Sequence, residues 1–393
     1  MNSIHSKLFA NLMTICQNPN NIGKFFFTDV PGTVMSEDGK LARYRIFNYH
    51  IAAYSDWLQP GATFARGHMF EIDDERNPIR LACCPPEKFF NLYENPFTMD
   101  IKPEDVIGLA DKADGSLIST YLDNGHLRLK SKGSLTSDQA NAAYRWLAQP
   151  GNHILMGFLT GIVHSGYTVN MEWCAPNNRI VLEYPEPSLK IHSIYNNNTL
   201  EMLSPAEYIN ANHSELFVEW FDPTPVASNP NAFDEMRKQT GVEGWVMYTK
   251  DRAFKLKTDW YVTLHRCKDS VNNNKALVTT ILENAQDDLY AMFHDDPETL
   301  GRIKEFEQSV TEYVAVSWAK INREYVANNH MDRKGYALAG QKAFKNTEPG
   351  NLFGVYMRMY QGGSTDCYDQ LIDNLKKDAV KLTPAKYLIE DSL

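Results

Sequence analysis

The distribution of proline divides this 393-residue chain into two parts of different character. Sixteen of its 19 prolines precede residue 231, and only three follow Lys275. Proline disrupts helix interiors and favours turns, so the proline-poor part can hold long helices. We therefore expect an α+β fold, in which short strands with a few helices come first and an all-α region follows Asn272-Asn273-Asn274.

Local patterns predict individual elements within this scheme. Residues 116–122 and 127–131 flank Asp123-Asn124-Gly125, a combination typical of a β-hairpin. A helix is expected over residues 137–148, and one continuous helix over residues 276–293. Further strands are expected at residues 168–174, 179–183, 189–195, 244–248 and 253–257.

Composition predicts a globular protein of the cytoplasm. The chain is 43% hydrophobic and 22% charged, and its length suggests two or three domains. It has no apolar run of about 18 residues, and its first residues lack a signal-peptide pattern, so no membrane association is expected. Six cysteines without a Cys-x-x-Cys pair favour a reducing compartment over a disulfide framework or a zinc ribbon.

The net charge of −10 is unfavourable for binding nucleic acid over the whole surface. One short stretch differs from the rest. Between Lys250 and Lys268 there are six cations and two acids, a local charge of +4. Acidic residues elsewhere would restrict nucleic-acid binding to that face rather than prevent it.

The sequence Lys112-Ala113-Asp114-Gly115-Ser116 has the pattern of a lysine nucleophile site. In a covalent nucleotidyltransferase, a lysine amine attacks the α-phosphate of a nucleotide and keeps the nucleotide as a lysyl phosphoramidate. A free lysine is almost wholly protonated at neutral pH, so the site must favour loss of the proton through nearby cations, a metal or burial. The alternative is a surface turn, because Asp-Gly is common in turns.

Carboxylates and lysines downstream support the catalytic interpretation. Glu172 lies near the end of an apolar strand, and Glu243 precedes Gly244. Lys255 and Lys257 are two apart, so in a strand they share one face. Lysines can neutralise phosphates, and carboxylates can hold Mg²⁺ or ribose hydroxyls. Each residue alone fits an ordinary surface or structural role equally well; the order of all of them along the chain is harder to obtain by accident.

Several segments together give the chain a resemblance to the phage RNA ligase 1 family, the tRNA-repair ligases of T-even bacteriophages, over nearly its full length. Besides the Lys112 motif, these segments are residues 44–49, 54–57, 66–71, 87–92, 94–99, 130–134 and 257–265. The resemblance implies a nucleotidyltransferase (adenylation) domain with antiparallel sheets over residues 1–268. It also implies a helical C-terminal domain over residues 275–393, with a role in tRNA specificity.

The resemblance also implies roles for particular residues. Lys112 would carry AMP, and the nucleotidyl-transfer steps would be supported by Lys132, Glu243 and Tyr261. ATP would be contacted by Tyr49, Arg66, Lys88, Phe90, Glu172, Lys255 and Lys257, with Phe90 beside the base. Asp287 falls where the family places a metal ligand. Complementarity to a helix dipole is the alternative for an acid at the start of a helix.

The implied activity is ATP-dependent RNA ligation with Mg²⁺, through lysyl-AMP and RNA-adenylate intermediates. The implied substrate is tRNA cut in the anticodon loop during phage infection, in the host cytoplasm. DNA ligases and mRNA-capping guanylyltransferases share the lysine motif, but they normally continue into a small β-barrel, whereas this chain continues as helices. A non-catalytic RNA-binding or assembly protein is the remaining alternative, and the family includes one ligase that assists tail-fibre attachment. No residues identify a protein partner.

Overall fold

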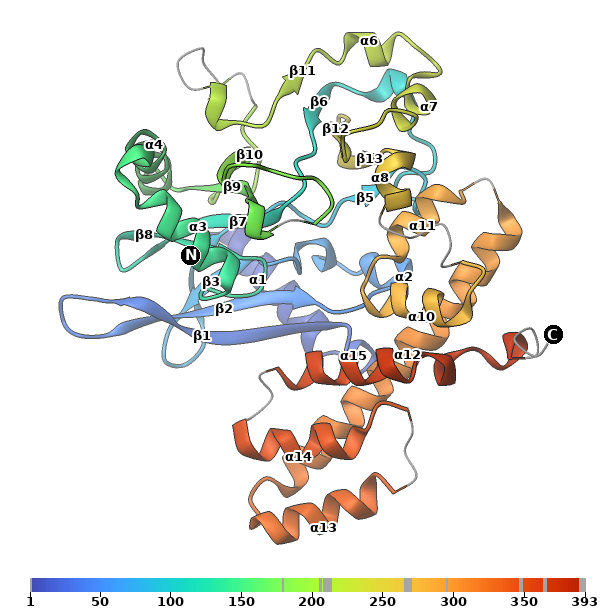
Figure 1. The fold of residues 1–393 in the computed structure, drawn as a ribbon. Coiled ribbons are helices and arrows are strands. Elements are labelled where there is room, and N and C mark those ends of the chain that lie inside the picture. Colours follow the sequence, from blue (N-terminus) through green and yellow to red (C-terminus); the bar gives the residue numbers. More distant parts are fainter. Residues whose placement is uncertain are drawn as a thin grey trace. The chain divides into compact units, whose positions relative to one another are not determined.

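The computed structural model describes residues 2–178, 180–204, 207, 214–264, 271–294, 296–345, 349–362 and 366–388. The chain forms two compact units. The first consists of Met1–Cys16, Phe25–Tyr49 and Trp57–His265, and the second of Gln17–Lys24, His50–Asp56 and Arg266–Leu393. The sheets belong to the first unit and a series of helices to the second, so the predicted α+β class is confirmed (Figure 1).

Among the described residues, the strands of the first unit form three sheets. The first has the order β1 (Phe25–Met35), β2 (Leu41–Tyr49), β3 (Met69–Ile72) and β4 (Pro78–Cys83). The second has the order β10 (Ser188–Asn196), β9 (Tyr167–Cys174), β7 (Ser116–Asp123) and β8 (His126–Ser131). The third has the order β11 (Trp220–Phe221), β6 (Gly108–Asp111), β12 (Gly244–Tyr248), β13 (Ala253–Lys257) and β5 (Phe90–Asn91). These pairings are antiparallel except that of β13 with β5, which is parallel.

The predicted hairpin and the helix after it are both confirmed. β7 and β8 pair in register around Asn124 and Gly125, which both have positive φ as a tight two-residue turn requires. Helix α3 (Asp138–Leu147) begins after Ser137, whose side chain accepts the Ala140 N–H as an N-cap. With α4 (His153–His164), α3 covers one face of the second sheet and buries an apolar core there (Figure 1).

The strand predicted at residues 179–183 is wrong for its described part, because the residues after Arg179 form a bend. The backbone N–H groups of Val181 and Leu182 donate to the carboxylate of Asp114, at 2.8 and 2.6 Å, instead of to a neighbouring strand. A side chain far away in sequence thus takes the place of a ladder partner. Apolar β-branched composition alone could not reveal this.

The remaining helices are distributed over both units. The first unit also contains α1 (Ser3–Gln17), α6 (Thr224–Ala227), α7 (Ala232–Arg237) and α8 (Asp259–Leu264), and α2 (Tyr54–Trp57) lies at its boundary. The second contains α10 (Asn274–Leu282), α11 (Gln286–Met292), α12 (Pro297–Asn328), α13 (Arg333–Ala343), α14 (Leu352–Gly362) and α15 (Cys367–Lys377). In the part of the chain that the structure describes, no helix combines the length and apolarity needed to cross a bilayer.

The single helix predicted over residues 276–293 is interrupted. α10 ends at Leu282 and α11 starts at Gln286. Between them Asn284 has a φ of 57°, a left-handed conformation that asparagine tolerates and that ends a right-handed helix. The apolar spacing continues across this break, so periodicity could not locate it.

Two short N-terminal segments belong to the second unit. Gly23, with a φ of 80°, lies so close to α12 that a Cβ would come within 2.8 Å of the Ala315 Cα. His50 stacks on Tyr368 with ring centroids 3.5 Å apart, and Lys24 pairs with Asp56 at 2.8 Å. These contacts explain why residues 17–24 and 50–56 group with helices that follow them by more than 200 residues.

Candidate active site

Lys112 lies where the chain passes from the third sheet to the second. It follows β6 directly, and β7 begins four residues later, at Ser116. Its backbone N–H donates to the carbonyl of Gly244 at 3.0 Å, which continues the pairing of β6 with β12. Lys112 is therefore held at a sheet boundary rather than in a free surface turn, and its side chain remains 20% exposed.

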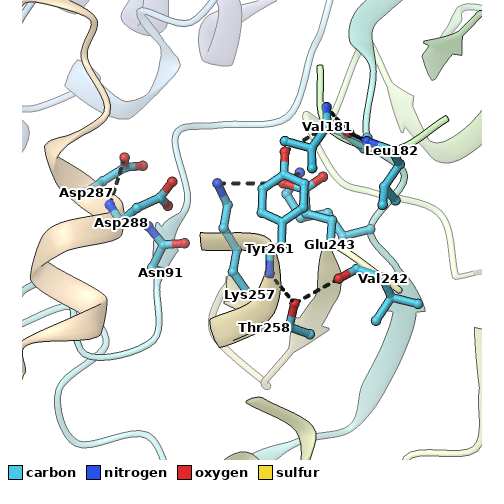
Figure 2. A network of polar contacts seen from close by, with 12 residues as sticks. Asn91, Val181, Leu182, Val242, Glu243, Lys257, Thr258, Tyr261, Asp287 and Asp288 are labelled. Carbon is cyan, nitrogen blue, oxygen red and sulfur yellow. Dashed lines mark hydrogen bonds and ion pairs between the residues drawn. The ribbon is translucent and has the colours of Figure 1, made fainter. Parts of the chain in front are cut away.

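A buried carboxylate joins two of the predicted lysines. Glu243 precedes β12 and its side chain is only 3% exposed. Its Oε1 lies 2.8 Å from the Lys112 Nζ. The same oxygen lies 3.6 Å from the Lys257 Nζ, and Figure 2 shows Lys257 beside Glu243. Its Oε2 is buried without a hydrogen-bond partner among the described residues. Oε1 thus contacts two cations. Oε2 is a buried acceptor that a bound ligand could satisfy.

The strand register explains this arrangement. Gly244 pairs with Lys257 across β12 and β13, and Val246 pairs with Lys255, so both lysines lie opposite the segment that carries Glu243. Along β13 the lysines are partly exposed, whereas Phe254 and Leu256 are buried in the core. The predicted shared face of Lys255 and Lys257 is therefore confirmed.

Two glycines allow the backbone to close around the site. A Cβ on Gly115 would lie 2.3 Å from the Trp173 carbonyl oxygen on β9, so the lysine motif presses against that strand. Gly244 has a φ of 147°, and a Cβ there would lie 2.0 Å from the Leu256 carbonyl oxygen. Any larger residue at either position would displace the nucleophile segment or the Glu243 segment.

Glu172 lies on β9 within the electrostatic reach of the same groups. The pKa of Glu172 is raised to about 7, chiefly by removal from water; the positive charges of Lys112 and Arg66 limit the rise and the negative charge of Glu243 contributes to it. Asp111, next to Lys112, has its pKa raised by burial and then by Glu243. Carboxyl groups with raised pKa values therefore lie near Lys112, a combination that is common at functional sites.

Asp114, the aspartate of the lysine motif, connects separate segments of the chain through its carboxylate. It is 1% exposed, and its Oδ1 accepts the hydroxyl of Tyr261 at 2.8 Å. Its Oδ2 accepts the N–H groups of Val181 and Leu182, which Figure 2 shows above Tyr261. Tyr261, predicted to support catalysis, therefore ties α8 to the motif, and the Lys257 Nζ lies 5.3 Å from its ring centroid.

A second group of predicted residues combines lysines with aromatic rings. The Lys88 Nζ lies within 6 Å of three ring centroids, those of Tyr49 (5.7 Å), Trp57 (5.8 Å) and Phe90 (5.3 Å). The Lys132 Nζ lies 4.8 Å from the centroid of Tyr49. Such a surface offers faces for a planar base and cations for phosphates.

Arg66 connects the two groups. Its guanidinium lies over the ring of Phe89, 5.5 Å from the centroid, and the Lys255 Nζ approaches the same ring at 5.8 Å. Burial lowers the pKa of Lys132, and the positive charge of Arg66 lowers it further. Since Arg66 also acts on Glu172, the lysine–carboxylate group and the aromatic group form one electrostatic environment.

The structure thus brings together all but one of the predicted site residues in the first unit. The exception is Asp287, which lies in α11 of the second unit, where its Oδ1 accepts the Asp288 N–H at 3.1 Å. Of the cations counted in the stretch 250–268, Arg266 and Lys268 lie outside the described residues. The described residues contain no cluster of three or more His, Cys, Asp or Glu that could hold a metal.

Sequence reasoning missed some residues of the site. His192 lies on β10 at an irregularity in its pairing with β9, and its Nδ1 contacts the Ser193 hydroxyl at 3.0 Å. Burial first, and then the positive charges of Arg66 and Lys112, lower the pKa of His192 to about 3, so this imidazole lies within the field of both cations. A lone histidine in a strand carries no signal of this. A sequence signal did exist for Phe89 and Asp111, because Phe89 lies between Lys88 and Phe90 and Asp111 directly precedes Lys112.

Two family models match most of the chain. A family model described as RNA ligase matches residues 64–261, half of the chain, and one described as T4 RNA ligase 1, C-terminal domain, matches residues 268–387. The curated relative RNA ligase 1 of Bacteriophage TS2126 is 27% identical over 217 residues, 53% of this chain and 53% of the relative. The chain therefore spans about half the length of this relative.

Solved structures show weaker similarity. A Naegleria gruberi RNA ligase with PPi has a TM-score of 0.36 at 15% identity, covering 50% of this chain and 63% of that chain. A putative ATP-dependent DNA ligase from Aquifex aeolicus has a TM-score of 0.41 at 12% identity, covering 85% of this chain and 96% of that chain. Overlaps of this size are too low to assign the fold or the activity.

Proposed function

The chain belongs to the T4 RNA ligase 1 family, and on that premise we propose that it is an ATP-dependent RNA ligase that joins a 3′-hydroxyl to a 5′-phosphate end. The observation that supports this most directly is the Lys112 amine, 2.8 Å from the buried carboxylate of Glu243, with Lys257 on the same oxygen. A nucleophilic lysine, a carboxylate that orients it and a second cation are the groups that nucleotidyl transfer to lysine requires.

The residues would divide the work as follows. After losing a proton, the Lys112 Nζ would attack the α-phosphorus of ATP, forming a P–N bond as pyrophosphate leaves. AMP would then pass to an RNA 5′-phosphate, and attack by a 3′-hydroxyl would release it. Positioning and charge neutralisation dominate such in-line transfers, so Lys255, Lys257 and Arg66 would act by holding phosphates.

The aromatic group would hold the base of the nucleotide. Phe90 stacks on Phe97 with centroids 5.2 Å apart and planes inclined by 17°, and Lys88 and Tyr49 lie beside it. Tyr49, Lys88 and Phe90 would thus contact ATP, and Lys132 would support transfer from its place over the ring of Tyr49. Glu172 would contact the nucleotide from β9.

Mg²⁺, when bound, would neutralise phosphate charge and promote departure of pyrophosphate. The residues fit this ion: Mg²⁺ commonly takes one or two protein carboxylates and completes its shell with waters and phosphates. Glu243 Oε2, buried without a described partner, is suited to be such a ligand. Asp287 in the second unit remains a proposed ligand.

The substrate and setting are proposals supported only by the family resemblance. We propose tRNA broken in the anticodon loop as the substrate, in the cytoplasm of an infected host, with the adenylation domain at residues 1–268 and tRNA specificity in the helical domain at residues 275–393. A structural role in tail-fibre attachment would be an addition to ligation, and none of the described contacts assigns residues to it.

The test is covalent labelling of the full chain. Purified protein is incubated with Mg²⁺ and α-labelled ATP or GTP and then denatured and resolved, beside Lys112→Ala and the exposed-lysine control Lys40→Ala. We expect acid-labile AMP on the wild type and on Lys40→Ala, and none on a folded Lys112→Ala. Labelling by GTP would favour a capping enzyme, and absence of any adduct from a folded wild type, free of AMP at the start, would favour the binding or assembly alternative.

A further inference from the structure

Lys130 is a fully buried lysine two residues before the predicted site residue Lys132. It lies on β8 with 0% of its surface exposed. Lysine is almost never buried to this extent unless its charge is paired. The described residues nevertheless include no carboxylate in ion-pair contact with Lys130. A buried cation without a counter-charge destabilises a fold, so its presence here calls for a specific function.

Its amine instead bridges two backbone segments. The Lys130 Nζ donates to the Gly67 carbonyl oxygen at 2.9 Å and to the Lys132 carbonyl oxygen at 3.3 Å. Gly67 directly follows Arg66, and the second carbonyl belongs to Lys132 itself. The two segments come from different sheets, one preceding β3 and the other following β8. Lys130 therefore links the backbones that carry two of the predicted site cations.

The two segments pack too closely for any side chain at Gly67. Gly67 has a φ of 93°, and a Cβ there would lie 2.6 Å from the Lys132 carbonyl oxygen and 3.4 Å from the Lys130 Nζ. The Lys130 amine donates to a carbonyl oxygen of each segment, and it has hydrogens to donate whether it is charged or neutral.

The side chains beyond this link act on one another. Lys132 lies over Tyr49, and the charge of Arg66 reaches both Lys132 and Glu172. Two cations that face one site repel each other, so their separation has to be imposed by the backbone. A displacement of about 1 Å at such a position can lower a transfer rate about a hundredfold.

We propose that Lys130 is a positioning residue that sets the separation of Arg66 and Lys132, so that both cations act on the same phosphate during nucleotidyl transfer. This inference rests on the proposed ligase function. It differs from a general contribution to folding in one respect: the effect of Lys130 on the reaction should pass through Lys132 and Arg66, whereas its effect on stability need not.

The test is a double-mutant cycle in the full chain. Lys130→Met keeps the length and apolar stem of the side chain but removes the donor, whereas Lys130→Gln retains an N–H donor. Each is combined with Lys132→Ala, and the rates of enzyme–AMP formation and of AMP transfer to 5′-phosphorylated RNA are measured at saturating ATP and below the melting temperature. Leu127→Val, a core change on the same strand, is the control for lost stability.

We expect Lys130→Met to slow at least one step by about tenfold to a hundredfold, and Lys130→Gln to lie closer to the wild type. Lys130→Met should slow the reaction by a smaller factor in Lys132→Ala than in the wild type, whereas the effects of Leu127→Val and Lys132→Ala should multiply. Multiplying effects for the Lys130 pair, or a wild-type rate in Lys130→Met, would overturn the proposal while leaving the ligase assignment intact. If Lys130→Met does not fold, the same comparison with Lys130→Gln decides. A wild type that forms no adduct would overturn both.

Discussion

The glycine after Glu243 illustrates how much a single residue determines in this site. Gly244 has a φ of 147° and faces the Leu256 carbonyl oxygen, which a Cβ would approach to 2.0 Å. We expect Gly244→Ala to lower the free energy of unfolding by about 2–3 kcal/mol, because both backbone strain and steric overlap oppose the methyl group. Urea denaturation measures the change.

Gly157 provides the matched control for that prediction. It is exposed within α4 and lacks a positive φ, and a Cβ at this position would meet no atom within 4 Å. Gly157→Ala should therefore stabilise the protein, by about 0.5–1 kcal/mol, through helix propensity alone. Equal effects of the two substitutions would contradict the assigned role of the Gly244 backbone.

Glu172 gives a prediction about pH. Its pKa is about 7 in the folded protein, whereas an ordinary glutamate has a pKa of 4.5. Between pH 4.5 and 7 the folded state therefore binds a proton that the unfolded state has lost. Stability contributed by the protonated carboxyl is present at low pH and is lost as the pH rises toward 7. Relative to Glu172→Gln, the wild type should lose up to about 3 kcal/mol of unfolding free energy between pH 4.5 and 8. Parallel pH profiles of the two proteins in urea would contradict this.

The sequence predicts best those site residues that belong to a motif or a spacing pattern along the chain. Lys112, Glu243 and the pair Lys255 and Lys257 are predicted from their order and spacing, and the register of β12 with β13 places Lys257 opposite Gly244, next to Glu243. His192 could not be found in this way, because its nearness to Arg66 and Lys112 depends on a pairing irregularity between two strands. The buried link through Lys130 likewise depends on a contact with Gly67, 63 residues earlier.

At the scale of elements, Asp114 joins the lysine motif, the bend at residues 180–182 and α8. Three donors converge on its carboxylate: the N–H groups of Val181 and Leu182 and the hydroxyl of Tyr261. We expect Asp114→Ala to destabilise the protein by about 3 kcal/mol or more, because buried donors lose a charged acceptor. Tyr261→Phe, which removes one of the three, should cost about 1–2 kcal/mol.

The two substitutions also test how the elements depend on each other. If Asp114 acts as their common anchor, adding Tyr261→Phe to Asp114→Ala should produce almost no further loss in urea denaturation. Fully additive losses would mean that Tyr261 stabilises α8 independently of the motif. The absence of a strand at residues 180–182 has the same cause, since Asp114 takes the donors that a sheet would use.

Element boundaries were predictable where local chemistry sets them. The Ser137 cap starts α3, and the Asn124-Gly125 turn sets the β7–β8 hairpin. The break between α10 and α11 was not predictable, because Asn284 lies within a run whose apolar spacing continues on both sides. Helical periodicity reports which face is buried, and it is insensitive to one left-handed residue between two helices.

At the scale of the whole molecule, the second compact unit consists of more than the C-terminal part of the chain. Residues 17–24 and 50–56 belong to it, through Gly23 against Ala315 and His50 against Tyr368. Proline content along the chain shows where helices begin, but it contains no information about contacts across more than 200 residues. The sequence could therefore indicate a helical region without indicating which distant segments complete it.

The composition of this unit predicts how a fragment behaves. A fragment of residues 266–393 keeps α10 to α15 but loses the His50–Tyr368 stacking and the packing of Gly23 on α12. Loss of one aromatic pair alone is expected to remove about 0.5–1.5 kcal/mol. We expect the fragment to be helical by circular dichroism but to unfold at lower urea than the helical unit of the full chain. In the full chain, His50→Ala and Tyr368→Ala should each destabilise that unit, and their combination should add little, since either one abolishes the stacking. A fragment that unfolds at the same urea concentration as the unit in the full chain would show that the N-terminal segments contribute no stability to it.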